Sequence, residues 1–282
     1  MIICKTIDSL HSVLFPAGKP KVSIGFVPTM GALHKGHLSL IGLSKQADTL
    51  TVCSIFVNPT QFNDPKDFEK YPVTIEQDIL MLERAGCHVL FLPAVQEMYP
   101  NGTAPSLHYD LGYLETLLEG SHRPGHFQGV CQVVHRLLDI VQPTHLYLGQ
   151  KDYQQCMVLK KLIELIDSPA VLTIGPTLRE ASGLAMSSRN MRLSEDDKQK
   201  ATAIYEAHYF IKQHIQQGAL LPLLQLAQKR ILEAGFEKID YVAIGNAATL
   251  QPVTNWDGKE QLVVLTAAFL NGVRLIDNML LN

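Results

Sequence analysis

The stretch Phe26-Val27-Pro28-Thr29-Met30-Gly31-Ala32-Leu33-His34-Lys35-Gly36-His37 decides the fold that this sequence predicts. The apolar run 22–27 predicts a buried strand, which we expect Pro28 to end because proline lacks a ladder donor. From His37 onward, apolar residues at helical spacing predict a helix packed on a sheet. Two histidines therefore lie where a strand passes into a helix N-terminus, whose free N–H groups and positive dipole favour phosphate.

This His-x-Gly-His spacing admits two interpretations. His34 and His37 could simply end a loop and cap the helix. Two histidines with two glycines directly after a strand favour a nucleotide site instead. No third histidine, cysteine or carboxylate lies nearby in the sequence to complete a metal site, so we expect no metal ligand here.

Composition limits the classes of function. The chain has 282 residues and a formal net charge of -3, which gives no electrostatic case for nucleic acid or an anionic membrane. Its five cysteines are odd in number and scattered, which favours buried thiols in a reducing compartment. With no signal-peptide pattern and no long apolar run, we expect a soluble cytoplasmic protein.

Strand and helix signals alternate through the first part of the chain. Beyond the opening unit, the sequence predicts strands at 49–57, 89–92, 145–148 and 171–174, helices at 75–84, 129–141 and 153–166, and a polar loop at 60–72. Such alternation is typical of an α/β fold with a doubly wound, Rossmann-like parallel sheet.

The pattern changes after Arg192. The sequence predicts helices at 196–217 and 220–234, followed by strands at 239–244, 262–268 and 274–277. Strands in succession without helices between them indicate a smaller α+β domain with an antiparallel sheet. We therefore expect a nucleotide-binding domain over 1–176 and a second domain over 177–282.

The unusual loops 28–37, 58–72, 149–155 and 177–190 fall where strands end, so a parallel sheet would gather them at one edge. In the third loop, Lys151 supplies a positive charge and Asp152 could accept from a ribose hydroxyl, although both residues could merely cap a helix. In the fourth, the run Ser187-Ser188-Arg189 could donate to phosphate oxygens, or could form a surface turn.

Neutral amides suggest a second substrate. Asn58, Gln61 and Gln155 suit a hydroxyl-rich molecule or a carboxylate, or could simply be turn residues. Arg123 and His126 lie in a Pro-Gly loop that could be a lid, a second anion contact or a polar linker. Taken together, the loops predict nucleotidyl transfer with a triphosphate and a small polar co-substrate, and they leave the acceptor open.

Five ordered motifs, at 28–37, 54–62, 123–130, 149–155 and 183–190, resemble the pantoate–β-alanine ligase family, within the His-x-Gly-His nucleotidyltransferases. The resemblance implies two steps. The carboxylate of pantoate attacks the α-phosphorus of ATP to give pantoyl adenylate and pyrophosphate, and the amine of β-alanine then attacks the acyl carbon to give pantothenate and AMP. It also implies Mg²⁺ bound with the ATP phosphates and a homodimer formed through the first domain.

The resemblance also implies roles for individual residues. ATP would contact Met30, Gly31, Ala32, Leu33, His34, Lys35, Gly36, His37, Gly149, Gln150, Lys151, Asp152, Leu178, Met186, Ser187, Ser188 and Arg189. The catalytic set among them would be His34, His37, Lys151, Ser187, Ser188 and Arg189. His37 would be the proton donor, and the helix dipole favours its neutral form. Pantoate and β-alanine would bind Gln61, Gln155, Asn58, Arg123 and His126, and the C-terminal domain would act as a lid.

Two alternatives remain open. One is another His-x-Gly-His adenylyltransferase that moves AMP onto a phosphate ester, and it gives no reason for the Gln61 and Gln155 loops. The other is a nucleotide-sensing module without turnover, which would not need a proton donor. Ser182 and Val73 depart from the residues that are common in the family, which bears on local contacts and affinity.

Overall fold

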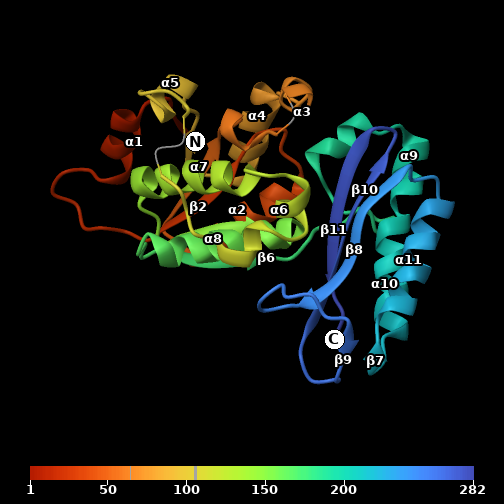
Figure 1. The fold of residues 1–282 in the computed structure, drawn as a ribbon. Helices are drawn as coiled ribbons and strands as arrows, with labels where there is room; N and C mark the ends of the chain where they lie inside the picture. The colour runs from red at the N-terminus through yellow and green to blue at the C-terminus, as the bar shows by residue number, and fades with distance from the viewer. Residues whose placement is uncertain (64, 105–106) are drawn as a thin grey trace. The chain divides into compact units, whose positions relative to one another are not determined.

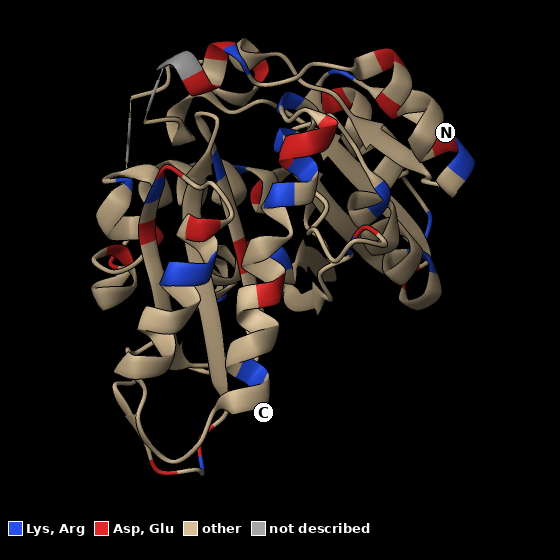
Figure 2. Ribbon diagram, turned by 90° about the vertical axis from the view of Figure 1, so that its right-hand side faces the viewer, with Lys and Arg blue, Asp and Glu red and all other residues tan. Residues whose placement is uncertain are grey.

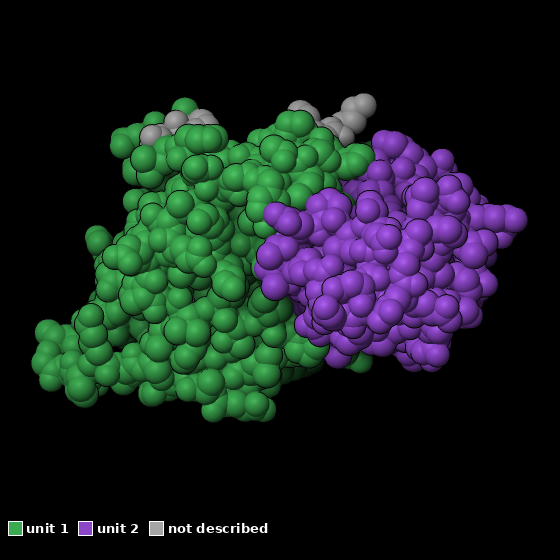
Figure 3. All heavy atoms as spheres, turned by 60° about the horizontal axis from the view of Figure 1, so that its bottom comes forward, with its two compact units in different colours: residues 1–149, 155–176 green, residues 150–154, 177–282 purple. Residues whose placement is uncertain are grey.

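The computed structural model describes residues 1–63, 65–104 and 107–282. They form two compact units, residues 1–149 with 155–176 and residues 150–154 with 177–282 (Figure 3). The second unit thus takes in the segment Gln150–Gln154, which the sequence predicts as part of the first domain. Asp64, within the predicted loop 60–72, lies outside the described residues.

The first unit is built on a six-stranded, fully parallel sheet with the order β1-β4-β3-β2-β5-β6. Its strands are β1 (Ile2–Cys4), β2 (Ile24–Thr29), β3 (Leu50–Ile55), β4 (Val89–Phe91), β5 (His145–Gly149) and β6 (Val171–Gly175). This topology confirms the Rossmann-like parallel sheet predicted from the sequence. The edge strand β1 was not predicted, because three residues are too short to show a periodic pattern.

Figure 1 labels β2 and β6 of this sheet among the helices of the first unit. The helices are α1 (Ile7–Leu14), α2 (Lys35–Ala47), α3 (Pro65–Glu69), α4 (Ile75–Ala85), α5 (Val95–Met98), α6 (Glu119–His122), α7 (His126–Val141) and α8 (Tyr153–Leu165), with 3-10 turns η1 (Pro59–Gln61) and η2 (Gly112–Glu115). The first two residues of α8 belong to the second unit. Helix α2 packs on β2, β3 and β5, and its Ile41 is buried with Val27 and Leu90 in one apolar cluster.

Three local predictions were wrong. Strand β2 continues through Pro28 to Thr29, because pairing with β5 covers only Gly25 and Phe26 and the missing N–H of Pro28 falls where β2 is paired on one side. The predicted loop 60–72 contains the short helix α3. Helix α7 begins at His126, so part of the predicted Pro-Gly loop is the first turn of that helix.

The second unit is a three-stranded antiparallel sheet with the order β11-β10-β8, flanked by two long helices (Figure 1). Its elements are β8 (Lys238–Asn246), β10 (Leu262–Leu270), β11 (Val273–Leu280), α9 (Glu195–Ala201), α10 (Ala203–His214), α11 (Leu221–Glu233), the short pair β7 (Gly218–Ala219) and β9 (Asn255–Trp256), and the 3-10 turns η3 (Gln150–Asp152) and η4 (Ser188–Arg192). Helix α10 packs on β11, and α11 packs on β8. The α+β character predicted for this part of the chain is confirmed.

One helix prediction in this unit needs correction. The helix expected over 196–217 is two helices, because the chain breaks at Thr202, which ends α9 and begins α10. The Thr202 hydroxyl donates to the Gln199 carbonyl at 2.7 Å, so the side chain competes with the backbone ladder at the break.

Charge is mixed along both units. Figure 2 shows Lys and Arg interspersed with Asp and Glu on the ribbon. Among the described residues, no helix combines the length and apolar character that a membrane span needs. The five cysteines are buried free thiols, as predicted.

Candidate active site

The parallel sheet of the first unit has its topological switch point between β2 and β5. From β2 the chain adds strands on one side, towards β3 and β4, and from β5 it adds β6 on the other side. Ligands of open α/β sheets bind at the carboxyl ends of the strands at such a point. The carboxyl end of β2 leads into Met30–His37, and the carboxyl end of β5 is Gly149. The topology therefore gives the His-x-Gly-His turn the position of a ligand site.

The turn before the histidines is held by a buried carboxylate. Gly31 and Ala32 have φ values of 82° and 48°, which fold the chain back sharply. Asp78 of α4, which is fully buried, accepts from the Ala32 N–H at 2.9 Å and from the Leu33 N–H at 2.8 Å. Charge-assisted bonds of this kind are stronger than neutral ones, so Asp78 fixes the turn.

Asp78 was not among the predicted site residues. The sequence does carry a signal for it, since this acidic residue lies on the apolar stripe of α4 with Leu82, which is also fully buried. A carboxylate at a core-facing helical position requires hydrogen-bond donors.

The two histidines both cap α2 and hold each other. His34 Nδ1 accepts from the Gly36 N–H at 3.1 Å, and His37 Nδ1 accepts from the His34 N–H at 3.3 Å. Their ring centroids are 4.0 Å apart. A nitrogen that accepts carries no proton, so these bonds assign the ring proton of each neutral imidazole to Nε2. The capping interpretation thus describes the Nδ1 side of each ring.

The Gln61 amide belongs to a network at the carboxyl end of β3. Gln61 Nε2 donates to the Met30 sulfur at 3.0 Å, and its Oε1 accepts from Asn58 Nδ2 at 3.3 Å. Asn58, 1 % exposed, is fixed in turn by the Tyr99 hydroxyl at 2.9 Å. The structure thereby brings together Met30, Asn58 and Gln61, which the sequence predicts as site residues.

Arg123 and His126 also join this network. His126 Nδ1–H donates to the Gln61 carbonyl at 2.7 Å, and the Arg123 guanidinium donates to His126 Nε2 at 3.0 Å. Arg123 also lies 3.6 Å from the Glu119 carboxylate. His126 therefore holds the Gln61 backbone, and Arg123 holds the His126 ring, contacts that their positions in the sequence did not reveal.

Helix α7 approaches this loop through Gly129. The Gly129 carbonyl accepts from Asn58 Nδ2 at 3.2 Å, and a Cβ at Gly129 would lie 2.1 Å from the Thr60 carbonyl oxygen. No larger residue fits without moving η1, so Gly129 sets the position of the loop that carries Gln61.

In the second unit, Lys151 lies in the 3-10 turn η3. Its side chain is 16 % exposed, and its Nζ is 3.9 Å from the Asp152 carboxylate. The Tyr153 hydroxyl donates to the Ala247 carbonyl at 2.7 Å, which ties the end of this turn to the same unit. A lysine on a turn whose backbone is tied in this way supplies a positive charge suited to an anionic ligand.

The predicted serine and arginine loop follows a hairpin of the same unit. The Met186 N–H donates to the Leu178 carbonyl at 3.0 Å, and Ser187 caps η4 by accepting from the Arg189 N–H at 3.3 Å. Ser188 is 8 % exposed. Two hydroxyls and a guanidinium therefore follow one another in sequence directly after the hairpin.

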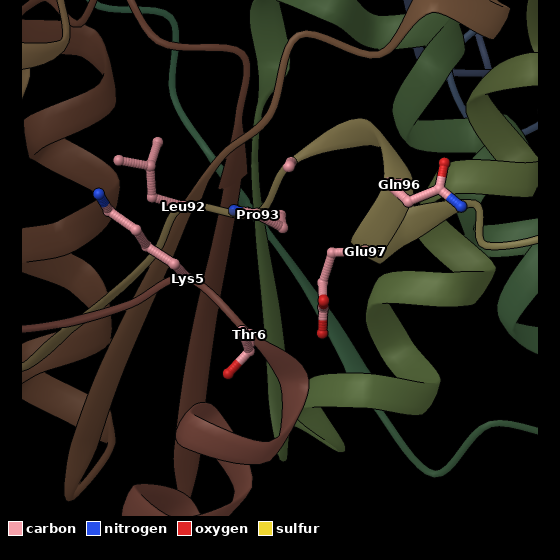
Figure 4. Close-up of a pocket in the computed structure, with 7 residues that line it drawn as sticks. Lys5, Thr6, Leu92, Pro93, Gln96 and Glu97 are labelled. Carbon is pink, nitrogen blue, oxygen red and sulfur yellow. The ribbon is translucent and has the colours of Figure 1, made fainter.

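A separate open hollow of about 530 Å³ lies beyond the carboxyl ends of β1 and β4 (Figure 4). It is lined by Lys5, Thr6, Leu92, Pro93, Ala94, Gln96 and Glu97. Glu97 Oε1 accepts from the Ile7 N–H at 2.7 Å, and Thr6 caps α1. These hydrogen bonds stabilise the fold at this edge of the sheet. None of the predicted site residues lines the hollow.

A parallel sheet with a His-x-Gly-His turn at its switch point, followed by a unit bearing lysine, serine and arginine loops, defines the class of the His-x-Gly-His α/β nucleotidyltransferases. Within that class, the family model for pantoate–β-alanine ligase matches residues 2–280. The chain belongs to this family.

Curated relatives and solved structures are similar to this chain along its whole length. It is similar to the pantothenate synthetase of Cytophaga hutchinsonii, 45% identical over 100% of this chain and 99% of the relative, and to that of Pseudomonas fluorescens strain Pf0-1, 44% identical over 99% and 97%. A crystal structure of the enzyme from Thermus thermophilus superposes with a TM-score of 0.89 at 38% identity, covering 99% of each chain. The Francisella tularensis pantoate–β-alanine ligase, solved with β-γ ATP and β-alanine, gives 0.84 at 38% identity, covering 99% of this chain and 97% of that one.

Proposed function

We propose that this chain joins pantoate to β-alanine with ATP through a pantoyl-adenylate intermediate, and that His34 and His37 act on the phosphates. The observation that carries the proposal is the pair of Nδ1 acceptors, which assigns a proton to each Nε2 at the carboxyl end of β2. Family membership supports the overall reaction.

In the first step the pantoate carboxylate attacks the α-phosphorus of ATP, a new P–O bond forms, and pyrophosphate leaves. Negative charge grows on the leaving pyrophosphate, and fixed donors stabilise it better than reorganising water does. We assign this role to the Nε2–H of His37, the proton donor, with His34 beside it. We also assign triphosphate contacts to Lys151, Ser187, Ser188 and Arg189.

The other proposed contacts with ATP come from the start of α2 and from residues beside the histidines, Lys151 and the Ser187–Arg189 segment. We propose that the N–H groups at the start of α2 face the phosphates, since a helix N-terminus favours anions. The remaining contacts are Met30, Gly31, Ala32, Leu33, Lys35, Gly36, Gly149, Gln150, Asp152, Leu178 and Met186.

In the second step the amine of β-alanine attacks the acyl carbon of the adenylate, the acyl C–O bond breaks, and AMP leaves with its oxygen. We propose that the amides of Gln61 and Gln155 orient pantoate in both steps. Asn58, Arg123 and His126 support substrate binding through the bonds that fix Gln61. A site of paired amides rejects analogues that leave an amide unsatisfied.

Mg²⁺ is proposed to bind with the ATP phosphates, where it would neutralise part of their charge. Within the described ranges, no group of three or more His, Cys, Asp or Glu side chains could hold a metal ion. The ion's oxygen ligands would therefore come mainly from the nucleotide. A cytoplasmic homodimer remains part of the proposal.

Pyrophosphate exchange into ATP tests the first step. With pantoate and Mg²⁺ present and β-alanine absent, exchange should occur, and it should stop when pantoate is omitted. His37→Ala should lower the exchange rate at least about 10²-fold, as expected for the loss of an electrostatic donor to the transition state. His108→Ala, at an exposed histidine, is the matched control. ATP binding without pantoate-dependent exchange, or wild-type exchange by His37→Ala, would overturn the proposal.

A further inference from the structure

The edge strand β11 of the second unit carries two neighbouring polar residues, Asp277 and Asn278, that are 6 % and 2 % exposed. Neighbouring residues of a strand point to opposite faces of its sheet. A buried carboxylate and a buried amide are costly unless each is fully hydrogen-bonded. Their partners therefore show what this strand is built to hold.

Asn278 holds the turn that carries Lys151. Its Nδ2 donates to the Gln150 carbonyl at 2.9 Å and to the Lys151 carbonyl at 2.8 Å, and its Oδ1 accepts from Gln150 Nε2 at 3.2 Å. Both amide protons are thus spent on successive backbone carbonyls of η3. The backbone of Lys151 is fixed to β11 by a side chain that is itself buried.

Asp277 holds the hairpin that leads to the serine and arginine loop. The Arg179 guanidinium donates to the two Asp277 oxygens at 2.7 and 3.0 Å, a bidentate pair. Arg179 also donates to the Gly183 carbonyl at 3.1 Å and to the Asn278 carbonyl at 3.2 Å, and it lies over the Tyr205 ring at 4.7 Å. One arginine therefore joins the strand to the first arm and the tip of the hairpin.

The hairpin passes this constraint on to residues 187–189. Arg179 and Ala185 form an antiparallel bridge, so the second arm of the hairpin is fixed to the first. Asn190 Nδ2 donates to the Ala185 carbonyl at 3.0 Å, which anchors the far side of the loop as well. The contacts form a continuous path from Asp277 to both ends of the Ser187–Arg189 segment.

We propose that Asp277 and Asn278 are positioning residues for adenylation, which together set the distance between Lys151 and the Ser187–Arg189 segment. The inference rests on the phosphate-binding roles proposed above for those residues. A lysine side chain is long and flexible, so its reach depends on where its backbone is held, and a displacement near 1 Å can cost about 10²-fold in rate. Asp277 and Asn278, adjacent on β11, thus restrict the backbone of Lys151 and that of the Ser187–Arg189 segment together.

The test separates positioning from general stability by measuring the two half-reactions of the full-length protein independently. Asn278→Ala should slow single-turnover adenylation about 10²-fold, while the attack of β-alanine on supplied pantoyl adenylate should stay within about threefold, since pyrophosphate has already left. Arg179→Lys keeps the charge but loses the bidentate fork, and it should show the same split where Asn278→Ala fails to fold.

The matched control is Asn271→Gly. Asn271 lies at the turn into β11 with φ 47°, and its Nδ2 donates to Asp197 at 2.6 Å. Glycine keeps that backbone conformation and removes the side-chain bond. This variant should leave the ratio of the two half-reaction rates unchanged. Equal slowing of both half-reactions by Asn278→Ala would show a purely structural role and would overturn the inference.

A double-mutant cycle with Lys151→Ala distinguishes failure of the inference from failure of the site assignment. If Asn278 acts through Lys151, the double variant should adenylate no more slowly than Lys151→Ala alone. Independent, multiplicative losses would contradict the inference while leaving the role of Lys151 intact. Wild-type adenylation by Lys151→Ala would refute the site assignment itself, and with it the inference.

Discussion

Replacing Gly129 by alanine should damage pantoate binding from a position outside the proposed substrate contacts. Gly129 lies in α7, and an alanine Cβ there would lie 2.1 Å from the Thr60 carbonyl oxygen, 2.6 Å from its carbon and 2.9 Å from Gln61 Cα. Ordinary van der Waals contact begins at 3.4 Å. The atoms that must move are backbone atoms of η1, so no side-chain rotation relieves the clash.

The size of the effect follows from these distances. Restoring contact at the Thr60 oxygen requires a shift of more than 1 Å, and a displacement of that size in a substrate-positioning group costs about 10²-fold in kcat/KM. Overpacking costs about 1–3 kcal/mol of stability, and the better helix propensity of alanine returns about 1 kcal/mol. The net loss of stability should therefore be about 0–2 kcal/mol, too little to explain the activity loss by unfolding.

The assay is steady-state kinetics with pantoate varied at saturating ATP and β-alanine, together with urea unfolding. Gly42→Ala is the control, because Gly42 is also helical but a Cβ there would meet nothing within 4 Å. It should gain about 0.5–1 kcal/mol and keep its kinetics. If Gly129→Ala keeps kcat/KM for pantoate within about threefold of Gly42→Ala, the role given to the Gln61 loop is wrong.

Two further predictions concern buried titratable groups. Asp78→Asn places an amide donor against the N–H groups of the Met30–His37 turn, so the free energy of unfolding should fall by about 2–3 kcal/mol and kcat/KM for ATP should drop. The control Glu76→Gln, at an exposed position of the same helix, should change the free energy of unfolding by less than about 0.5 kcal/mol. An Asp78→Asn variant that is as stable as the wild type would contradict this prediction. Burial lowers the pKa of His208 to about 4, so the folded protein keeps this ring neutral while the unfolded chain protonates it below about pH 6.5. The stability from His208 is complete above that pH and is lost as pH falls towards 4, by about 3 kcal/mol at 1.36 kcal/mol per pH unit. Urea unfolding from pH 7.5 to 4.5 should show this slope, and His208→Gln should flatten it; an unchanged slope would place the pH dependence elsewhere.

The parallel sheet could be predicted because its strands are continuous apolar runs that end at turn residues. The run before Met30 and the runs at 49–57 and 145–148 all became strands of the sheet. The three-residue β1 could not be predicted, since its pairing with β4 comes from the tertiary fold and not from local propensity. The strand end predicted at Pro28 was wrong because the penalty for proline depends on whether a neighbouring strand needs its N–H, and β5 does not pair with β2 at Pro28.

In the candidate site too, residues with a local sequence pattern could be predicted, and residues placed by tertiary contacts could not. Residues with a strong local pattern, such as His34 and His37, could be found from spacing, and the structure adds the tautomer that their capping bonds assign. Asp78 and Asn278 could not be found in this way, because each serves a loop distant in sequence. Their one local signal is a polar residue at a position that the pattern makes buried.

The fate of the carboxylate oxygen of pantoate tests the central claim most directly. Pantoate labelled with ¹⁸O in its carboxylate is turned over with ATP and β-alanine, and the nucleotide product is analysed by mass spectrometry. Attack on the α-phosphorus followed by cleavage of the acyl C–O bond predicts AMP that carries one ¹⁸O per turnover. Unlabelled AMP, or ADP as the nucleotide product, would contradict the pantoyl-adenylate route.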